Sequence, residues 1–160
     1  MDKINARSVL SLLGVALLLG AVGCAARQTG AKTESSAAGM DASGEVIDSS
    51  LVEPGSGKTI QGIDDWEGET TGQSFPGSKF DQLKMGMSIQ EVVQRLGEPN
   101  EFTTYMTGKA FIPYYFGSDQ SRREMVYANQ GRLVFAHEGG LSTTFHLIWI
   151  IYDKEQPGKL

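Results

Sequence analysis

Hydrophobic positions divide the chain into three parts. Val9 to Val22 is an uncharged and almost wholly apolar run of 14 residues. Residues 25–77 are rich in Gly, Ser, Thr, Ala and acidic side chains, too polar to bury the surface that would offset conformational entropy. Beyond Gly77, apolar residues recur at the spacings of helices and strands. We therefore expect a flexible linker over 24–77, a folded domain over 78–153 and a short tail over 154–160.

A short helix with complete start and stop signals lies near the beginning of the folded part. Ser88 and Glu91 have the spacing of a capping box, and Met87 before them can pack against the first turn. The apolar positions of one helical face are Ile89, Val92, Val93 and Leu96. Gly97 and Pro99 end the helix. A second short helix is expected just before it, through Phe80 and Leu83 to Gly86.

Strand patterns follow the helix. The side chains of residues 111–116 alternate between two faces, which predicts a strand. Pro113 places that strand at a sheet edge or a bulge. Residues 125–127 and 133–135 flank the turn Asn129-Gln130-Gly131 and predict a tight hairpin. The run 143–152 adds a fourth strand. Together these elements predict an α+β fold with two short N-terminal helices packed on a small antiparallel sheet of three to four strands.

The fourth run is apolar on both faces, which is typical of a strand covered on both sides or of one that meets a partner. Two interpretations follow: an additional sheet strand covered by other elements, or a protein-docking edge. The candidate docking side chains on one face are Phe145, Leu147, Trp149 and Ile151.

The first 23 residues have the features of a secretory signal peptide. Lys3 and Arg7 give a basic start, and the apolar run is too short to span a bilayer, which takes about 20 residues. The run ends in Ala21-Val22-Gly23-Cys24, which resembles a bacterial lipobox. This resemblance implies cleavage between Gly23 and Cys24 and lipidation of Cys24, the one cysteine of the chain.

No cofactor is expected apart from the lipid on Cys24. The resemblance implies a covalent diacylglycerol and an N-acyl chain on Cys24, and several chains anchor a protein firmly. Ala25, rather than an aspartate, follows the cysteine, which favours the outer membrane with the domain facing the periplasm. A linker of 53 residues would span roughly 40 Å on average. Trp66 is expected to hold that linker against the folded part or a partner.

Three segments together resemble the SmpA/OmlA (BamE-like) domain: GMSIQEVVQRLGEP, IPYYFG and MVYANQGRLVF. The resemblance implies an accessory role in outer-membrane β-barrel assembly, with assembly proteins as partners. The matching motif residues are architectural and transfer no binding site; they are Gly86, Met87, Ser88, Glu91, Gly97 and Pro99. The alternative function is an envelope-stability lipoprotein that binds phospholipid or cell wall.

Charge and the types of reactive side chain limit the functions that we expect. Residues 25–77 carry nine acids and three bases, and residues 78–160 carry nine of each, so nucleic acid is not an expected partner. His137 and His146 lack companions at metal-ligand spacing. No catalytic constellation is evident, so we expect neither an enzyme nor a small-molecule substrate. Arg122 and Arg123 are expected in a loop, either solvated or in contact with phospholipid headgroups or an acidic partner.

Overall fold

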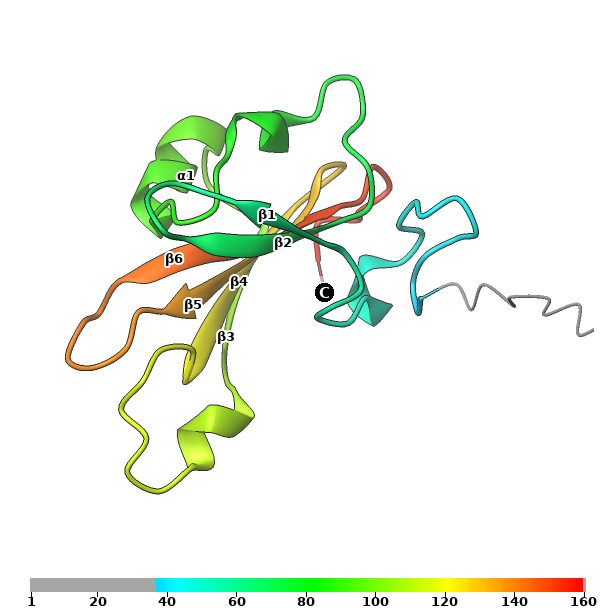
Figure 1. The fold of residues 1–160 in the computed structure, drawn as a ribbon. Coiled ribbons are helices and arrows are strands. Elements are labelled where there is room, and N and C mark those ends of the chain that lie inside the picture. Colours follow the sequence, from blue (N-terminus) through cyan, green and yellow to red (C-terminus); the bar gives the residue numbers. More distant parts are fainter. Residues whose placement is uncertain (1–36, 160) are drawn as a thin grey trace, which may run out of the picture. The chain divides into compact units, whose positions relative to one another are not determined.

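One six-stranded sheet organises residues 37–159, which are the residues that the computed structural model describes (Figure 1). The strands lie in the order β1-β2-β6-β5-β4-β3; β2 and β6 are parallel and the other neighbours antiparallel. The elements are η1 (Ser49–Leu51), β1 (Lys58–Gln61), β2 (Glu67–Thr71), η2 (Lys79–Gln82), α1 (Ile89–Leu96), β3 (Glu101–Met106), η3 (Gly108–Phe111), β4 (Ser121–Tyr127), β5 (Gly131–His137) and β6 (Phe145–Tyr152).

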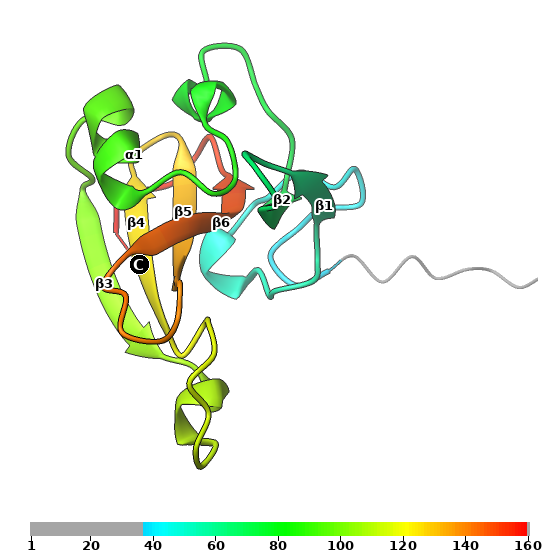
Figure 2. The same ribbon diagram turned by 60° about the vertical axis from the view of Figure 1, so that its left-hand side comes forward.

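The sheet has a separate hydrophobic cluster on each face, because successive strand residues point to opposite sides. Leu133 and Phe135 of β5 belong to the larger cluster, which α1 and η2 cover. Val134, between them, belongs to a smaller cluster with Trp149 and Ile151, which residues 40–52 cover. Figure 2 shows α1 and this N-terminal segment on different sides of β5 and β6.

The predicted helix with the Ser88–Glu91 capping box is confirmed as α1. The Ser88 hydroxyl accepts a hydrogen bond from the Glu91 amide, and the Glu91 carboxylate accepts one from the Ser88 amide at 2.8 Å. Hydrogen bonds from Ser88 lower the pKa of Glu91. Val92 is fully buried, and Gly97 ends the helix with a φ of +87°, a conformation that favours glycine.

The predicted arrangement of two helices on three or four strands is wrong: the structure has one short α-helix and a six-stranded mixed sheet. The segment expected to form the first helix makes only the 3-10 turn η2. It cannot continue, because the chain then runs extended along β6. The Gly86 amide donates to the Leu147 carbonyl at 2.8 Å, and the Leu147 amide donates to the Met87 carbonyl at 2.8 Å.

The expected linker is also corrected, since its described residues from Ala37 onward belong to the fold. Strand β2 pairs with β6, and the Trp149 indole donates to the Thr71 hydroxyl at 2.9 Å. Val46 and Val52 are buried against Trp149. The segment holds few apolar residues, but they cover the second face of the sheet, which would otherwise be exposed. Trp66 does hold the segment in place, because its ring stacks on His146 with centroids 4.4 Å apart.

Residues 111–116 are not a strand. They form the end of η3 and an irregular loop, in which Pro113 has no amide hydrogen to donate and Tyr114 has a φ of +60°. The edge strand is instead β3, in a stretch that the sequence analysis left without an element. The hairpin of β4 and β5 around Asn129-Gln130-Gly131 is confirmed.

Strand β6 lies inside the sheet, hydrogen-bonded to β5 on one side and to β2 on the other. The candidate docking residues on it, Phe145, Leu147, Trp149 and Ile151, are at most 7 % exposed. They do not share one face, as was predicted, because the register shifts opposite Val134 and Phe135. Phe145 and Leu147 belong to the larger cluster, and Trp149 and Ile151 belong to the smaller one. Of the two interpretations of residues 143–152, the structure therefore supports an additional sheet strand that other elements cover.

Candidate functional site: an apolar tip beside an open sheet edge

Exposed apolar side chains are concentrated at one end of the sheet. Ten large hydrophobic residues are exposed among residues 37–159, and eight of them lie on β3 or on the loops that follow β3 and β5. Single exposed apolar residues are ordinary, but a cluster of them is typical of a contact surface.

Two loops form what we call the apolar tip: residues 107–120 between β3 and β4, and residues 138–144 between β5 and β6. The first loop protrudes beyond the end of the sheet in both views (Figures 1 and 2). The loops contact each other, since the Gly140 amide donates to the Phe116 carbonyl at 3.0 Å. The exposed side chains of the tip, with exposures from 52 % to 103 %, are Met106, Phe111, Ile112, Tyr114, Phe116 and Leu141.

The polar groups of the tip bond to one another. Asp119 lies at their centre, where its carboxylate accepts hydrogen bonds from Arg122 Nε at 2.6 Å and from Lys109 Nζ at 3.0 Å. The Gln120 side-chain amide donates to the carbonyls of Tyr115 and Gly117 at 3.1 Å. The loop backbone is thus fixed from within while its apolar side chains remain exposed.

This network of hydrogen bonds and ion pairs keeps the Asp119 carboxylate ionised. Burial on its own would raise the pKa of the Asp119 carboxyl, but hydrogen bonds and attraction from Arg122 and Lys109 outweigh it and place the pKa below its ordinary value. The ionised Asp119 carboxylate therefore stabilises the folded state. This stabilisation is complete at neutral pH, above the unfolded pKa of about 3.9, and is lost as the pH falls through the lower pKa of the folded state.

Replacing Asp119 with Asn is expected to loosen the tip without unfolding the sheet. The substitution removes charge-assisted hydrogen bonds, each contributing about 1.5–3 kcal/mol, so amide hydrogen exchange in residues 107–120 should accelerate about tenfold or more. Hydrogen exchange read by mass spectrometry at pH 7 measures this. The control Asp65→Asn, at an exposed acid in the turn between β1 and β2, should leave these amides unchanged; equal exchange in both variants would contradict the role of Asp119.

Strand β3 is the open edge next to the tip, and no strand of the described chain pairs with its outer side. The Thr107 amide donates to the carbonyl of Gln120, which directly precedes β4. Because hydrogen-bonded positions alternate along an antiparallel pair, the backbone of Thr104 faces away from β4. Exposed Phe102 and Tyr105 flank this position. Natural edges are usually protected by lysine or proline, and β3 has neither.

Arg122 and Arg123 lie in β4, not in a loop. Arg122 is bound to Asp119, as described above. The Arg123 guanidinium lies 4.0 Å from the centroid of the Phe145 ring and 5.8 Å from that of Phe102, a cation–π arrangement. Arg123 also lines a hollow of about 280 Å³ beside the start of α1 and residues 143–145. Both arginines therefore border the apolar tip.

The architectural motif residue Gly86 lies where the N-terminal segment crosses β6. Gly86 has a φ of +87°, and a Cβ there would come within 2.7 Å of the Trp66 ring. His146 Nδ1 lies 2.8 Å from the Gly86 carbonyl, so His146 has a structural position on β6. These residues fix the crossing of the N-terminal segment over β6.

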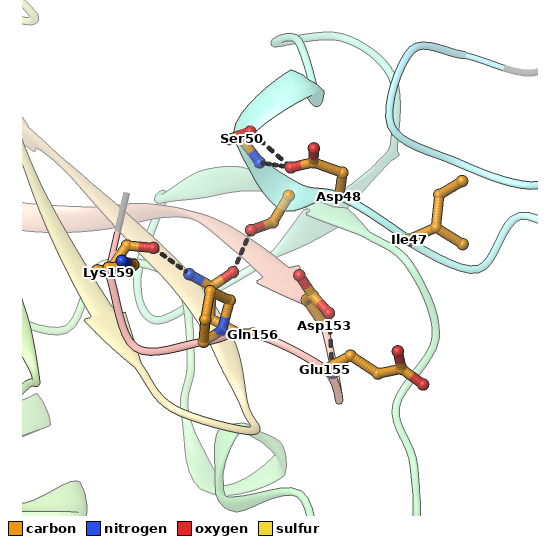
Figure 3. A pocket seen from close by; sticks show the side chains of 9 residues that line it. Ile47, Asp48, Ser50, Asp153, Glu155, Gln156 and Lys159 are labelled. Atoms are coloured by element: carbon orange, nitrogen blue, oxygen red, sulfur yellow. Dashed lines mark hydrogen bonds between the residues drawn. The ribbon is translucent and has the colours of Figure 1, made fainter.

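A polar hollow of about 290 Å³ lies where the N-terminal segment meets the C-terminal residues (Figure 3). Its side chains bind one another. The Ser49 hydroxyl donates to Gln156 Oε1 at 2.5 Å, and the Gln156 amide donates to the Lys159 carbonyl at 2.9 Å. Gln156 is buried, so residues of the expected tail are part of the fold. The hydrogen bonds around this hollow connect the N-terminal segment of the described chain to its C-terminal residues.

Sequence reasoning missed the tip because its aromatic residues alternate as in a strand. The signals that oppose a strand are Pro113 inside the run and the flanking Gly108 and Gly117. Leu141 was missed because it follows two glycines in a short turn and belongs to no periodic pattern.

Within the described range, no group of three or more His, Cys, Asp or Glu side chains could hold a metal ion. None of the helices in residues 37–159 is long and apolar enough to cross a membrane. The predicted signal peptide and Cys24 lie outside the described residues. The fold and site define an α+β protein with one mixed sheet and an exposed apolar tip. Comparison of the chain with family models, curated proteins and solved structures gives no match.

Proposed function

We propose that this chain is a lipoprotein of the bacterial outer membrane, anchored through Cys24, that acts non-catalytically as a protein-binding module in β-barrel assembly. The signal-peptide pattern and lipobox-like sequence support the anchor. The motif resemblance stated above supports barrel assembly as the process, although its implied fold is corrected here. The domain faces the periplasm in this proposal.

The observation that carries a binding role is the open edge of β3. An extended segment of another protein can add to such an edge, with backbone hydrogen bonds for affinity and side-chain contacts for selectivity. Phe102 and Tyr105 project from β3 toward opposite faces of the sheet and would flank the added strand. Barrel proteins present extended strands before they close, so the edge suits either an assembly protein or its client.

Replacing Thr104 with Pro is expected to abolish partner recovery while leaving the domain folded. Proline at an outward-facing edge position removes a hydrogen-bond donor needed by an added strand, but none that β4 uses. The lipidated protein is purified from its own membranes in mild detergent, and co-purifying proteins are identified. Wild type should recover barrel-assembly subunits, and Thr104→Pro should lose them.

Thr59→Pro is the matched control at the opposite edge. The Gly62 amide donates to the Trp66 carbonyl, so by the same alternation Thr59 faces away from β2. This variant should retain the partners, and circular dichroism should show both variants folded. Recovery of only lipid or cell-wall fragments by wild type would favour the envelope-stability alternative and contradict barrel assembly.

A further inference from the structure

The apolar tip is a second surface, which the strand-addition role of β3 does not use. Five of its six exposed apolar side chains come from two loops that are joined by a hydrogen bond, and the sixth, Met106, ends β3. The first of these loops projects from one end of the sheet (Figure 1). Tyr114 is 92 % exposed and has a φ of +60°, a backbone conformation uncommon for a non-glycine residue. The fold therefore holds aromatic side chains in the solvent on a rigid loop.

The polar interior of the loop lowers the cost of leaving water. Unsatisfied backbone groups make irregular loops unfavourable in an apolar medium. In this loop the carbonyls of Tyr115 and Gly117 accept hydrogen bonds from Gln120, and the Ser118 carbonyl accepts one from the Tyr115 hydroxyl at 2.9 Å. The charge of Asp119 is matched by Arg122 and Lys109.

The tip together with its bordering arginines differs in charge from the domain as a whole. Residues 37–159 contain seventeen acidic and ten basic side chains. The tip loops, residues 107–120 and 138–144, contain two acidic side chains and one basic one, and Arg122 and Arg123 on β4 bring the basic count to three. An anionic lipid surface repels an acidic protein and attracts basic groups near it. The tip with its bordering arginines is thus the part of this domain best suited to approach phospholipid headgroups.

The length of chain before the fold keeps the domain near the membrane. Ala37, where the described fold begins, is thirteen positions after Cys24. A chain of that length spans at most about 45 Å when fully extended. A domain anchored at Cys24 therefore cannot leave the vicinity of the bilayer, so a weak apolar contact is made repeatedly. This step rests on the proposed lipid anchor.

We propose that the apolar tip enters the headgroup region of a phospholipid bilayer, with Tyr114, Phe116 and Leu141 among the immersed side chains and Arg123 and Lys109 at headgroup level. The tip then fixes the orientation of the domain on the membrane and leaves the β3 edge for a protein partner.

The test uses the lipidated full-length protein in vesicles of phosphatidylethanolamine and phosphatidylglycerol, with no other protein present. A cysteine replaces Leu141, which is fully exposed, and carries a nitroxide spin label; lipidation leaves Cys24 without a free thiol. The control label replaces Thr59, on the opposite edge strand. Accessibility to oxygen and to a water-soluble nickel complex reports immersion, and intact mass reports the lipid on Cys24.

The label at 141 should be severalfold less accessible to the nickel complex than the label at 59, and more accessible to oxygen. Adding Phe116→Ser and Tyr114→Ser should return the label at 141 to water, whereas Ile47→Ser and Leu51→Ser, exposed apolar residues outside the tip, should not. Equal accessibility at 141 and 59 in protein whose mass shows the lipid would overturn membrane entry. Loss of barrel-assembly partners in the membrane purification would overturn the proposed function and leave this result standing.

Discussion

A chain that ends at Gly140 is expected to be unfolded. The truncation removes β6, which pairs with both β5 and β2 and belongs to both hydrophobic clusters. Burial of a large apolar side chain contributes about 1.5–3 kcal/mol. Leu147, Trp149, Ile150 and Ile151 together therefore match the total stability of a typical domain, about 5–15 kcal/mol. Circular dichroism and one-dimensional proton NMR would show a disordered chain.

A chain that ends at Asp153 is the control for this truncation. It keeps β6 and loses the contacts of Gln156, so it should remain folded with a lower urea midpoint. A truncation at Gly140 that stays folded but loses partners would contradict the central position of β6 and would restore its alternative role as a docking edge.

A chain that begins at residue 78 should be strongly destabilised. It lacks β2, so the Trp149 indole loses the Thr71 hydroxyl, and it lacks Val46 and Val52, so Trp149 and Ile151 become exposed. We expect the free energy of unfolding to fall by at least about 3 kcal/mol. Trp149 would be the one tryptophan of that fragment, so a red-shifted emission spectrum reports its exposure directly.

The matched control begins at Ala37 and should unfold in urea with a single sharp transition. The comparison decides where the domain begins. Equal urea midpoints for the two fragments would mean that residues 37–77 are dispensable, as their linker-like composition suggests, and would contradict the packing of Trp149 described above.

Elements with local signals could be predicted from the sequence. The helix α1 has its cap, its apolar face and its terminating glycine within a dozen residues, and the β4–β5 hairpin has a short turn between two apolar runs. Each of these elements is specified by neighbours in the chain, so periodicity and capping chemistry suffice to identify it.

The elements that were missed depend on distant partners. Strand β2 reads as linker because it is polar and contains Gly68. A Cβ at Gly68 would come within 2.5 Å of the Met85 sulfur and the Ile148 carbonyl. The small residue is therefore required by close packing, and only the fold reveals that. Strand β2 also pairs with a strand almost eighty residues later, which no local pattern encodes.

The candidate site was also predicted only in part. The sequence correctly drew attention to the aromatic run at 111–116 and to Arg122 and Arg123, but it placed the first in a sheet and the second pair in a loop. Tyr114 adopts a left-handed conformation that its residue type does not suggest. Trp149 and Ile151 of β6 looked like part of a surface because their cover, residues 40–52, carries few hydrophobic positions. Phe145 and Leu147 lie instead in the larger cluster on the opposite face.

Site-specific photo-crosslinking in living cells would test the central claim most directly. A photoreactive amino acid at Thr104, on the outward side of β3, is compared with one at Thr59. We expect crosslinks from position 104 to a barrel-assembly subunit or to an unfinished barrel protein, and none of these from position 59. Absence of protein crosslinks at 104, in lipidated protein at the outer membrane, would contradict a protein-binding role for the β3 edge.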